Sequence, residues 1–281
     1  MEIIKSVKEM QRWSDQCRKQ GQTIVLVPTM GYLHEGHLSL MREGKRLGDK
    51  VVVSIFVNPA QFGPGEDLNT YPRDLKRDFH SAESAGVDII FTPNEWDVYP
   101  KGFDTYIDQE KLTLHLCGLS RPGHFKGVMT VVTKLFHMVA PQIAIFGEKD
   151  YQQLAIIRRM AKDLNFDIEI KSGPTVREPD GLAMSSRNVK LSSEQRKSAL
   201  ALYQSLQQAQ KQLLDGETRS EQLIAEATSL ILSHPGTAID YIHICDPDSL
   251  EDITKIDRPV LMVLAVKVGA VRLIDNKILN P

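Results

Sequence analysis

Two histidines, His34 and His37, have the type and spacing to bind an anionic phosphate. They belong to the stretch Pro-Thr-Met-Gly-Tyr-Leu-His-Glu-Gly-His at 28–37, which follows an apolar run at 23–27 and precedes Leu-Ser-Leu-Met at 38–41. This order predicts a strand, a glycine turn and the start of a helix. The first N–H groups of a helix are unpaired and lie at its positive end, so they attract phosphate. Residues three apart share a helix face, so both imidazoles can contact one anion.

Other chemistries fit this motif less well. A zinc protease needs its two histidines four residues apart, whereas His34 and His37 are three apart. Gly31 and Gly36 have the glycine spacing of a Walker-type phosphate loop, but the lysine and hydroxyl that should follow are replaced by His37 and leucine. A helix that merely begins with two histidines remains an alternative at this point.

The composition is that of an ordinary globular protein. The chain has 281 residues, 42% hydrophobic and 25% charged, with a formal net charge of −2. This charge gives no sign of a nucleic-acid or anionic-membrane surface, and a small-molecule substrate fits better. Cys17, Cys117 and Cys245 are too few and too widely spaced for a disulfide framework or a zinc ribbon. We expect core thiols, no membrane segment and a cytoplasmic location.

Short β-rich runs alternate with helical patterns in the first part of the chain. We expect strands near 23–30, 50–57, 87–92, 142–147 and 167–171. Nearly continuous apolar strands joined by helices are typical of a parallel sheet covered on both faces. The sequence therefore predicts a doubly wound, Rossmann-like α/β fold, in which ligands bind beyond the carboxyl ends of the strands.

The pattern of predicted elements changes after residue 175. Ser192 and Gln195 form a possible capping box at the start of a long helix, and a second helix is expected near 218–233. Strands follow, expected at 238–245, 260–268 and 270–274. We therefore expect two domains: a nucleotide- and acid-binding domain at 1–175 and a smaller α+β domain at 176–281.

Polar residues follow two more of the predicted strands. Asn58 and Gln61 are neutral amides that can both donate to and accept from a ligand with hydroxyls and a carboxylate. Lys149 could meet phosphate, and Asp150 could accept from ribose or help to hold magnesium. Turn chemistry is the alternative for Asn58, and a solvated helix start is the alternative for 148–150.

Two loops are also candidates. The segment Gly-Leu-Ala-Met-Ser-Ser-Arg-Asn at 181–188 could clamp the β- and γ-phosphates from the second domain, or could be only a polar linker. Gly-Pro-Gly-Glu-Asp at 63–67 suggests a mobile lid over the acid pocket, although a plain cluster of turns is equally compatible. Asp78, further along, is expected near a metal ion.

Four segments, in order, closely resemble the pantoate–β-alanine ligase family. They are Pro-Thr-Met-Gly-x-Leu-His-x-Gly-His at 28–37, Val-Asn-Pro-x-Gln-Phe at 57–62, Gly-Glu-Lys-Asp-Tyr-Gln-Gln at 147–153 and Asp-Gly-Leu-Ala-Met-Ser-Ser-Arg-Asn at 180–188. The resemblance runs from about residue 20 to 190. The C-terminal part agrees with the family only in its length and in the general character of its sequence. It implies the nucleotidyltransferase superfamily with its His-x-Gly-His signature.

The resemblance also implies roles for individual residues. His34 and His37 would contact the phosphates and stabilise the transferring α-phosphoryl group, with His37 as the proton donor. Gln61 and Gln153 would hold pantoate, and Asn58 would belong to the same pocket. The implied ATP-binding residues are Met30, Gly31, Tyr32, Leu33, His34, Glu35, Gly36, His37, Gly147, Glu148, Lys149, Asp150, Val176, Met184, Ser185, Ser186 and Arg187. Among these, Gly147 and Asp150 would contact ribose, Val176 and Met184 would flank adenine, and Lys149 with 185–187 would contact phosphates.

The implied reaction has two steps. ATP and pantoate, with Mg²⁺, give pantoyl-adenylate and pyrophosphate, and the amine of β-alanine then gives pantothenate and AMP. The family is typically homodimeric. Two alternatives remain: a nucleotidyltransferase acting on another acid or on a phosphate acceptor, and a non-catalytic nucleotide sensor. A phosphate acceptor would favour more cations than two neutral glutamines, and a sensor need not keep both the amide pair and the histidine pair.

Overall fold

The computed structural model describes residues 1–281 as two compact units. The first comprises residues 1–110, 121–148 and 156–174, and the second comprises 111–120, 149–155 and 175–281. The sequence predicted a division into 1–175 and 176–281, and the second unit here also includes two short segments from before residue 175.

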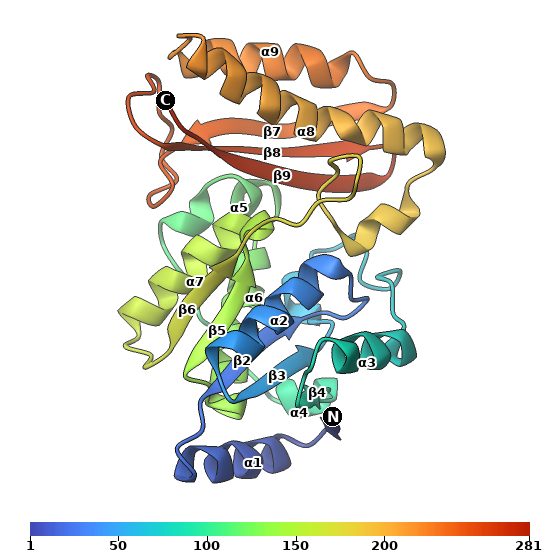
Figure 1. Ribbon diagram of the computed structural model, residues 1–281, viewed down its shortest axis with the longest axis vertical. Coiled ribbons are helices and arrows are strands. Elements are labelled where there is room, and N and C mark those ends of the chain that lie inside the picture. Colours follow the sequence, from blue (N-terminus) through green and yellow to red (C-terminus); the bar gives the residue numbers. More distant parts are fainter. The chain divides into compact units, whose positions relative to one another are not determined.

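The first unit is built on a six-stranded sheet in which every pairing is parallel (Figure 1). The order across the sheet is β1-β4-β3-β2-β5-β6. Its strands are β1 (Glu2–Ile4), β2 (Ile24–Thr29), β3 (Lys50–Ile55), β4 (Ile89–Phe91), β5 (Ile143–Gly147) and β6 (Glu169–Gly173). This confirms the predicted doubly wound α/β fold, with β1 as an additional edge strand.

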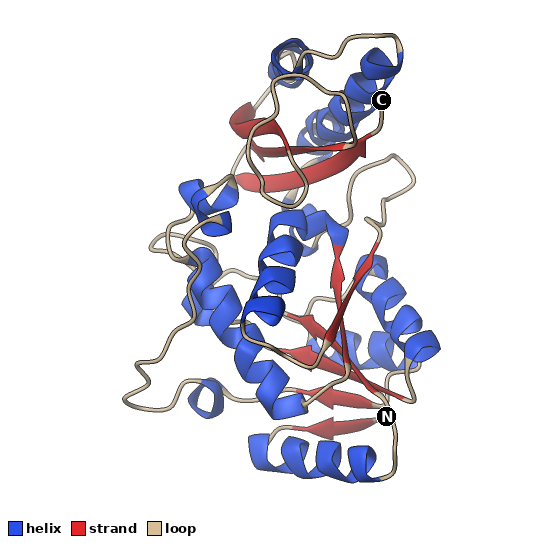
Figure 2. Cartoon of the chain, turned by 90° about the vertical axis from the view of Figure 1, so that its left-hand side faces the viewer, coloured by secondary structure: helices blue, strands red, loops and turns tan.

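Helices lie on both sides of this sheet (Figure 2). Helix α2 contacts α3, and α1 contacts α6. The helical segments between β1 and β6 are α1 (Val7–Lys19), α2 (Glu35–Leu47), η1 (Pro59–Gln61), α3 (Leu75–Ser84), α4 (Glu95–Val98), η2 (Leu112–Leu114), α5 (Cys117–Ser120), α6 (His124–Val139), η3 (Glu148–Asp150) and α7 (Tyr151–Asp163). Of these, η2 and α5 belong to the second unit, and η3 and α7 are divided between the two units. Side chains of the central strands, such as Val25, Val52 and Ile145, are fully buried. This burial on both faces explains why these strands are continuous apolar runs in the sequence.

Strand β2 lies between β3 and β5, and the chain extends the sheet first on one side of β2 and then on the other. It runs from β2 through β3 to β4 on one side, and later from β5 to β6 on the other side, while β2 pairs with both β3 and β5. The carboxyl ends of β2 and β5 therefore flank the point where the strand order reverses. In folds of this kind that point is the usual place for a ligand.

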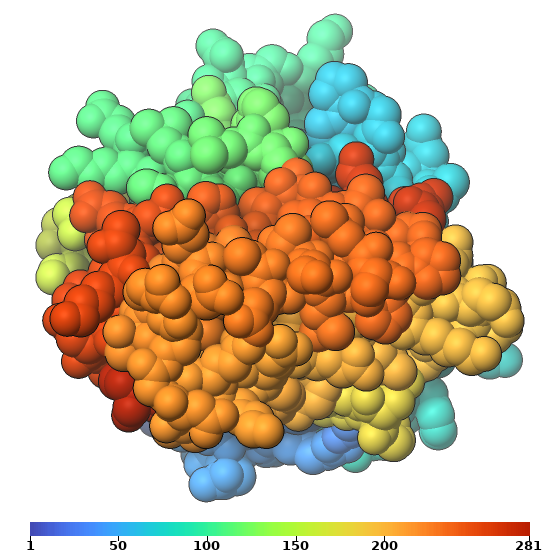
Figure 3. All heavy atoms as spheres, turned by 90° about the horizontal axis from the view of Figure 1, so that it is seen from above, coloured from blue at the N-terminus to red at the C-terminus, as the bar shows by residue number.

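The second unit contains a three-stranded antiparallel sheet in the order β7-β8-β9. Two helices pack against this sheet and bury a separate apolar core (Figure 1). Figure 3 shows the outer surface of these helices, coloured amber to orange. The elements are η4 (Ser186–Lys190), α8 (Ser193–Leu214), α9 (Ser220–Leu232), β7 (Thr237–Cys245), β8 (Val260–Val268) and β9 (Val271–Leu279).

Most of these C-terminal elements lie where the sequence predicted them, but the last strand, predicted at 270–274, runs from Val271 to Leu279. The capping box at Ser192 is present, with Ser192 Oγ accepting from the backbone of Gln195 and the Gln195 side chain accepting from the backbone of Ser192. The hairpin between β8 and β9 turns at Gly269, which has a φ of +59°. No helix in the chain is both long enough and apolar enough to cross a bilayer.

Candidate active site

The histidine motif forms the turn between β2 and the start of α2. Gly31 and Tyr32 both have left-handed backbone conformations, with φ of +83° and +51°. The first is natural for glycine, and the second is uncommon for a residue with a side chain. Hydrogen bonds hold this turn in two places. Gly31 N–H donates to Thr29 Oγ1 at 3.2 Å, and the backbone N–H groups of Tyr32 and Leu33 donate to the Asp78 carboxylate.

Asp78 is a buried carboxylate, 1% exposed, on helix α3. Its Oδ2 accepts from Tyr32 N–H at 2.8 Å, and its Oδ1 accepts from Leu33 N–H at 2.7 Å. Burial raises the pKa of Asp78, and the two backbone hydrogen bonds only partly oppose this. Asp78 therefore fixes the shape of the histidine turn.

The two histidines begin helix α2 as predicted. His34 is the N-cap residue, and His37 is the third residue of the helix. The backbone N–H of His34 donates to Nδ1 of His37 at 3.3 Å, and the two rings lie 4.0 Å apart between centroids. Because Nδ1 of His37 acts as an acceptor, the neutral ring carries its proton on Nε2. The donor group of the neutral His37 ring is therefore Nε2–H.

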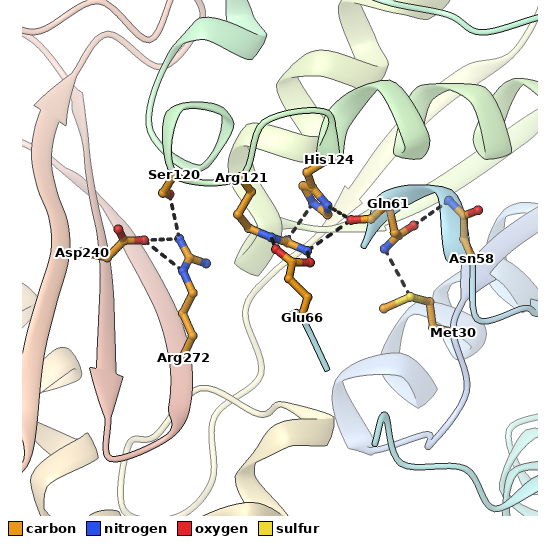
Figure 4. A network of polar contacts seen from close by, with 9 residues as sticks. All are labelled: Met30, Asn58, Gln61, Glu66, Ser120, Arg121, His124, Asp240 and Arg272. Carbon is orange, nitrogen blue, oxygen red and sulfur yellow. Dashed lines mark hydrogen bonds and ion pairs between the residues drawn. The ribbon is translucent and has the colours of Figure 1, made fainter. Parts of the chain in front are cut away.

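The amide pair lies at the end of the neighbouring strand. Asn58 caps η1 directly after β3, and Gln61 is the last residue of η1. Nε2 of Gln61 donates to Sδ of Met30 at 3.2 Å, so the amide segment and the histidine turn are in contact (Figure 4). The histidine turn and the amide pair therefore lie together at the carboxyl ends of β2 and β3.

Two residues that the sequence analysis did not assign to the site, Arg121 and His124, contact the backbone of Gln61, and Glu66 of the predicted lid segment pairs with Arg121. Ring Nδ1 of His124 lies 2.8 Å from the Gln61 carbonyl oxygen, and Arg121 Nη2 donates to the same oxygen at 3.3 Å (Figure 4). Arg121 also forms a bidentate pair with Glu66, at 2.7 and 2.6 Å. Only the fold brings them together, because Glu66 and Arg121 are 55 positions apart.

Gly147 and Glu148 stand at the end of β5, the other neighbour of β2. Oε1 of Glu148 accepts from the Ser172 hydroxyl at 2.8 Å. These two residues therefore lie at the same edge of the sheet as the histidine turn and the amide pair.

The remaining candidate residues belong to the second unit. Lys149 and Asp150 are in η3, and Gln153 is in the first turn of α7; the Lys149 carbonyl accepts from Asn276 Nδ2 at 2.8 Å. Val176 and Met184 are joined, because Met184 N–H donates to the Val176 carbonyl at 3.0 Å.

The predicted phosphate-clamping loop is held by its own polar contacts. Ser185 caps η4 by accepting from Arg187 N–H at 3.2 Å, and Ser186 and Arg187 are the first residues of that helix. Asn188 Nδ2 donates to Glu178 at 2.8 Å and to the Ala183 carbonyl at 3.1 Å. This loop therefore has a defined backbone shape within the second unit.

Asp78 has backbone partners in the structure but no cluster of further metal-binding side chains around it. Both oxygens of that carboxylate already accept from Tyr32 and Leu33, as described above. The chain contains no group of three or more His, Cys, Asp or Glu side chains arranged to hold a metal. Asp78 therefore holds the backbone of the turn, and its placement near a metal ion stays a prediction.

The doubly wound sheet, with a histidine pair at the start of the helix after β2, defines an α/β protein with a candidate anion-binding site beyond the carboxyl ends of its strands. A sequence profile described as pantoate-beta-alanine ligase matches residues 2–278. The chain therefore belongs to the pantoate–β-alanine ligase family, and it is an enzyme of that class.

Individual relatives agree with this assignment over the full length. Pantothenate synthetase of Desulfatibacillum aliphaticivorans is 59% identical over 281 residues, covering 100% of both chains. The crystal structure of pantothenate synthetase from Thermus thermophilus superimposes with a TM-score of 0.95 at 43% identity, again covering 100% of both chains. Pantoate-beta-alanine ligase from Francisella tularensis, solved in complex with beta-gamma ATP and beta-alanine, has a TM-score of 0.81 at 37% identity and covers 99% and 97%.

Proposed function

We propose that the chain condenses pantoate with β-alanine in two ATP-dependent steps. A carboxylate oxygen of pantoate attacks the α-phosphorus of ATP, forming a new P–O bond while the bond to the β,γ-diphosphate breaks and pyrophosphate leaves. The β-alanine nitrogen then attacks the acyl carbon, a C–N bond forms, AMP leaves and the nitrogen loses a proton. Adenylation is needed because a free carboxylate has no adequate leaving group for attack by an amine. Family membership over the whole chain supports this reaction.

The contact between Gln61 and Met30 carries the proposal on the structural side. It joins an amide suited to an organic acid to the turn that precedes the two histidines. An acid and a nucleotide phosphate bound there would be neighbours, as the first step requires. Catalysis of phosphoryl transfer depends mainly on positioning and on donors directed at developing negative charge.

The histidines supply such donors. Nε2–H of His37 and the N-terminal N–H groups of α2 present positive partial charge without a fixed cation. We assign His37 and His34 to stabilisation of charge on the transferring phosphoryl group and on the departing pyrophosphate, and His37 to proton donation. Met30, Gly31, Tyr32, Leu33, Glu35 and Gly36 complete the proposed nucleotide contacts of this segment.

The other nucleotide and substrate contacts are proposed from the resemblance. Gly147 and Asp150 would contact ribose, Glu148 would border the nucleotide, and Val176 and Met184 would flank adenine. The phosphate contacts would be Lys149, Ser185, Ser186 and Arg187. Gln153, like Gln61, would bind pantoate.

Magnesium enters this proposal as part of the substrate. Mg²⁺ is commonly held by nucleotide phosphates and water, with few protein ligands. We therefore propose that it arrives bound to ATP. The beta-gamma ATP and beta-alanine bound to the Francisella tularensis relative support ATP and β-alanine as substrates here.

A homodimer and a cytoplasmic location are further parts of the proposal. The homodimer rests on the resemblance to the family. Three buried free thiols, Cys17, Cys117 and Cys245, suit the reducing conditions of the cytoplasm.

Pyrophosphate release by the purified protein tests the proposed function. With ATP, Mg²⁺ and pantoate alone, we expect about one equivalent per active site, because the adenylate accumulates. Adding β-alanine should give sustained turnover and equal amounts of AMP. Turnover with another acid but not with pantoate would favour a related nucleotidyltransferase, and no release by folded protein under any condition would remove the proposal.

A further inference from the structure

The side chain of Asn58 uses its whole hydrogen-bonding capacity inside the protein. Its Oδ1 accepts from Ala60 N–H at 3.3 Å and from the Tyr99 hydroxyl at 2.7 Å. Its Nδ2 donates to the Gly127 carbonyl at 3.1 Å and to Oε1 of Gln61 at 3.0 Å. An amide has two donor hydrogens and two acceptor lone pairs, so all four are used.

Backbone groups set the orientation of this amide. Ala60 N–H can only donate, and the Gly127 carbonyl can only accept, so the oxygen and nitrogen of Asn58 cannot be exchanged. The Tyr99 hydroxyl supports the same orientation, because burial raises its pKa and keeps it protonated as a donor.

The close approach of α6 to η1 makes this arrangement possible. A Cβ atom on Gly127 would lie 2.2 Å from the carbonyl oxygen of Ala60, which no side chain can tolerate. Glycine at this position lets the helix backbone come within reach of Asn58. The Asn58 side chain is left only 1% exposed.

Asn58 in turn orients Gln61. The second hydrogen of Asn58 Nδ2 points to Oε1 of Gln61, so that oxygen is occupied and the Gln61 amide is turned with its NH₂ group away from Asn58 (Figure 4). That NH₂ group donates to Sδ of Met30 at 3.2 Å. Thioether sulfur is a weak acceptor, so a ligand oxygen can replace it at little cost.

We propose that Asn58 and Tyr99 are positioning residues that hold Gln61 so that it offers substrate its NH₂ group alone. Gln61 then selects an acid that presents an acceptor oxygen at this point, either a carboxylate or a hydroxyl lone pair. Asn58 itself does not touch the substrate, contrary to the role that the sequence analysis gave it. This inference rests on the proposed function only in taking the acid to be pantoate.

Asn58→Asp tests the orientation with almost no change in shape. The new carboxylate keeps its acceptors for Ala60 and Tyr99 but has no hydrogen for Gly127 or Gln61, so the Gln61 amide should turn over and present its oxygen. We expect the KM for pantoate to rise at least about tenfold, as for a lost hydrogen bond plus a repulsive contact. The KM for ATP should stay within about twofold.

Tyr99→Phe is a milder variant that keeps the inference testable if Asn58→Asp does not fold. It removes one donor, leaves Ala60 N–H in place, and should raise the KM for pantoate by about three- to tenfold. Tyr106→Phe is the matched control, because Tyr106 is 45% exposed and should be unaffected. Circular dichroism and thermal unfolding establish that each variant is folded.

A double-mutant cycle separates positioning from direct contact. If Asn58 acts only through Gln61, then Asn58→Asp adds no further loss of pantoate affinity in a Gln61→Ala background. The same should hold for Tyr99→Phe combined with Gln61→Ala. Additive losses would overturn the inference, as would an unchanged KM in both single variants. Inactivity of the wild-type protein towards pantoate would instead overturn the proposed function, and the two failures are thus distinguishable.

Discussion

Oδ1 of Asp78 accepts a hydrogen bond from the backbone N–H of Leu33 at 2.7 Å, across 45 positions of sequence. The other oxygen accepts from Tyr32, whose φ of +51° is uncommon for a residue with a side chain. A left-handed residue of this kind persists only where its surroundings hold it. Helix α3 thus determines the shape of the turn that delivers both histidines to the start of α2.

Asp78→Asn should therefore weaken both stability and the first reaction step. The amide keeps one acceptor oxygen but places an NH₂ group against a backbone N–H, leaving that donor without a partner. We expect the free energy of unfolding to fall by about 1–3 kcal/mol, with slower pyrophosphate release. Chemical denaturation measures the first effect. Glu83→Gln, an exposed change on the same helix, is the control, and equal behaviour of the two variants would contradict the role of Asp78.

His37 should act through its Nε2–H group. His37→Ala is expected to slow pyrophosphate release by about 10²–10³-fold, the loss typical of one donor directed at developing charge. His37→Gln places an amide NH₂ near the former Nε2 position and should retain part of the rate. Rapid-quench measurement of the first turnover compares the two. Equal rates for the two variants would show that the Nε2 donor has no such role.

The sequence predicted most of the fold because its core strands are local apolar runs. It missed β1 because only Ile4 of that short edge strand is buried. It ended the last strand at residue 274 because Asp275 and Asn276 interrupt the apolar pattern, whereas β9 continues to Leu279. Asp275 is tolerated there because it pairs with Arg177 at 2.6 Å, a contact 98 positions away that no local pattern reveals.

The same distinction applies to the site. The histidine turn and η1 are local features whose motifs placed them correctly. The partners that orient them are not local: Tyr99 reaches Asn58 across 41 positions, and Gly127 reaches it across 69. The sequence marks Asn58 as a candidate site residue. It does not reveal that groups of the protein itself occupy all four hydrogen-bonding positions of the Asn58 side chain.

Gln61→Ala should separate the two substrates. The amide is assigned to the acid, and its carbonyl partners, Arg121 and His124, hold the backbone and not the side chain. Truncation should weaken pantoate binding by about 1.5–3 kcal/mol if the bound oxygen is charged, and leave ATP binding nearly unchanged. Calorimetric titration with each ligand measures both affinities. Equal losses for pantoate and ATP would count against the assignment.

The pair between Glu66 and Arg121 should make the stability of the folded protein depend on pH. Burial raises the pKa of Glu66, but the hydrogen bonds and charge of Arg121 outweigh it, and the net pKa lies below the ordinary value of 4.5. A carboxylate with a lowered pKa stabilises the folded state above its ordinary value, and this contribution is lost as the pH falls through the lowered pKa.

Glu66→Gln should therefore be less stable than the wild type at neutral pH, by about 1 kcal/mol for a partly exposed pair. The difference should shrink as the pH falls below 4.5, where Glu66 becomes protonated in the unfolded chain, and should disappear below the lowered pKa, where the folded wild-type carboxyl group is protonated as well. Denaturation curves for both proteins at neutral pH and at a series of acid pH values measure this difference, with Glu83→Gln as the control. A difference that stays constant across the series would show that the charge of Glu66 does not contribute. The loop would then be held by the shape of its turns, as the glycines and proline at 63–65 also allow.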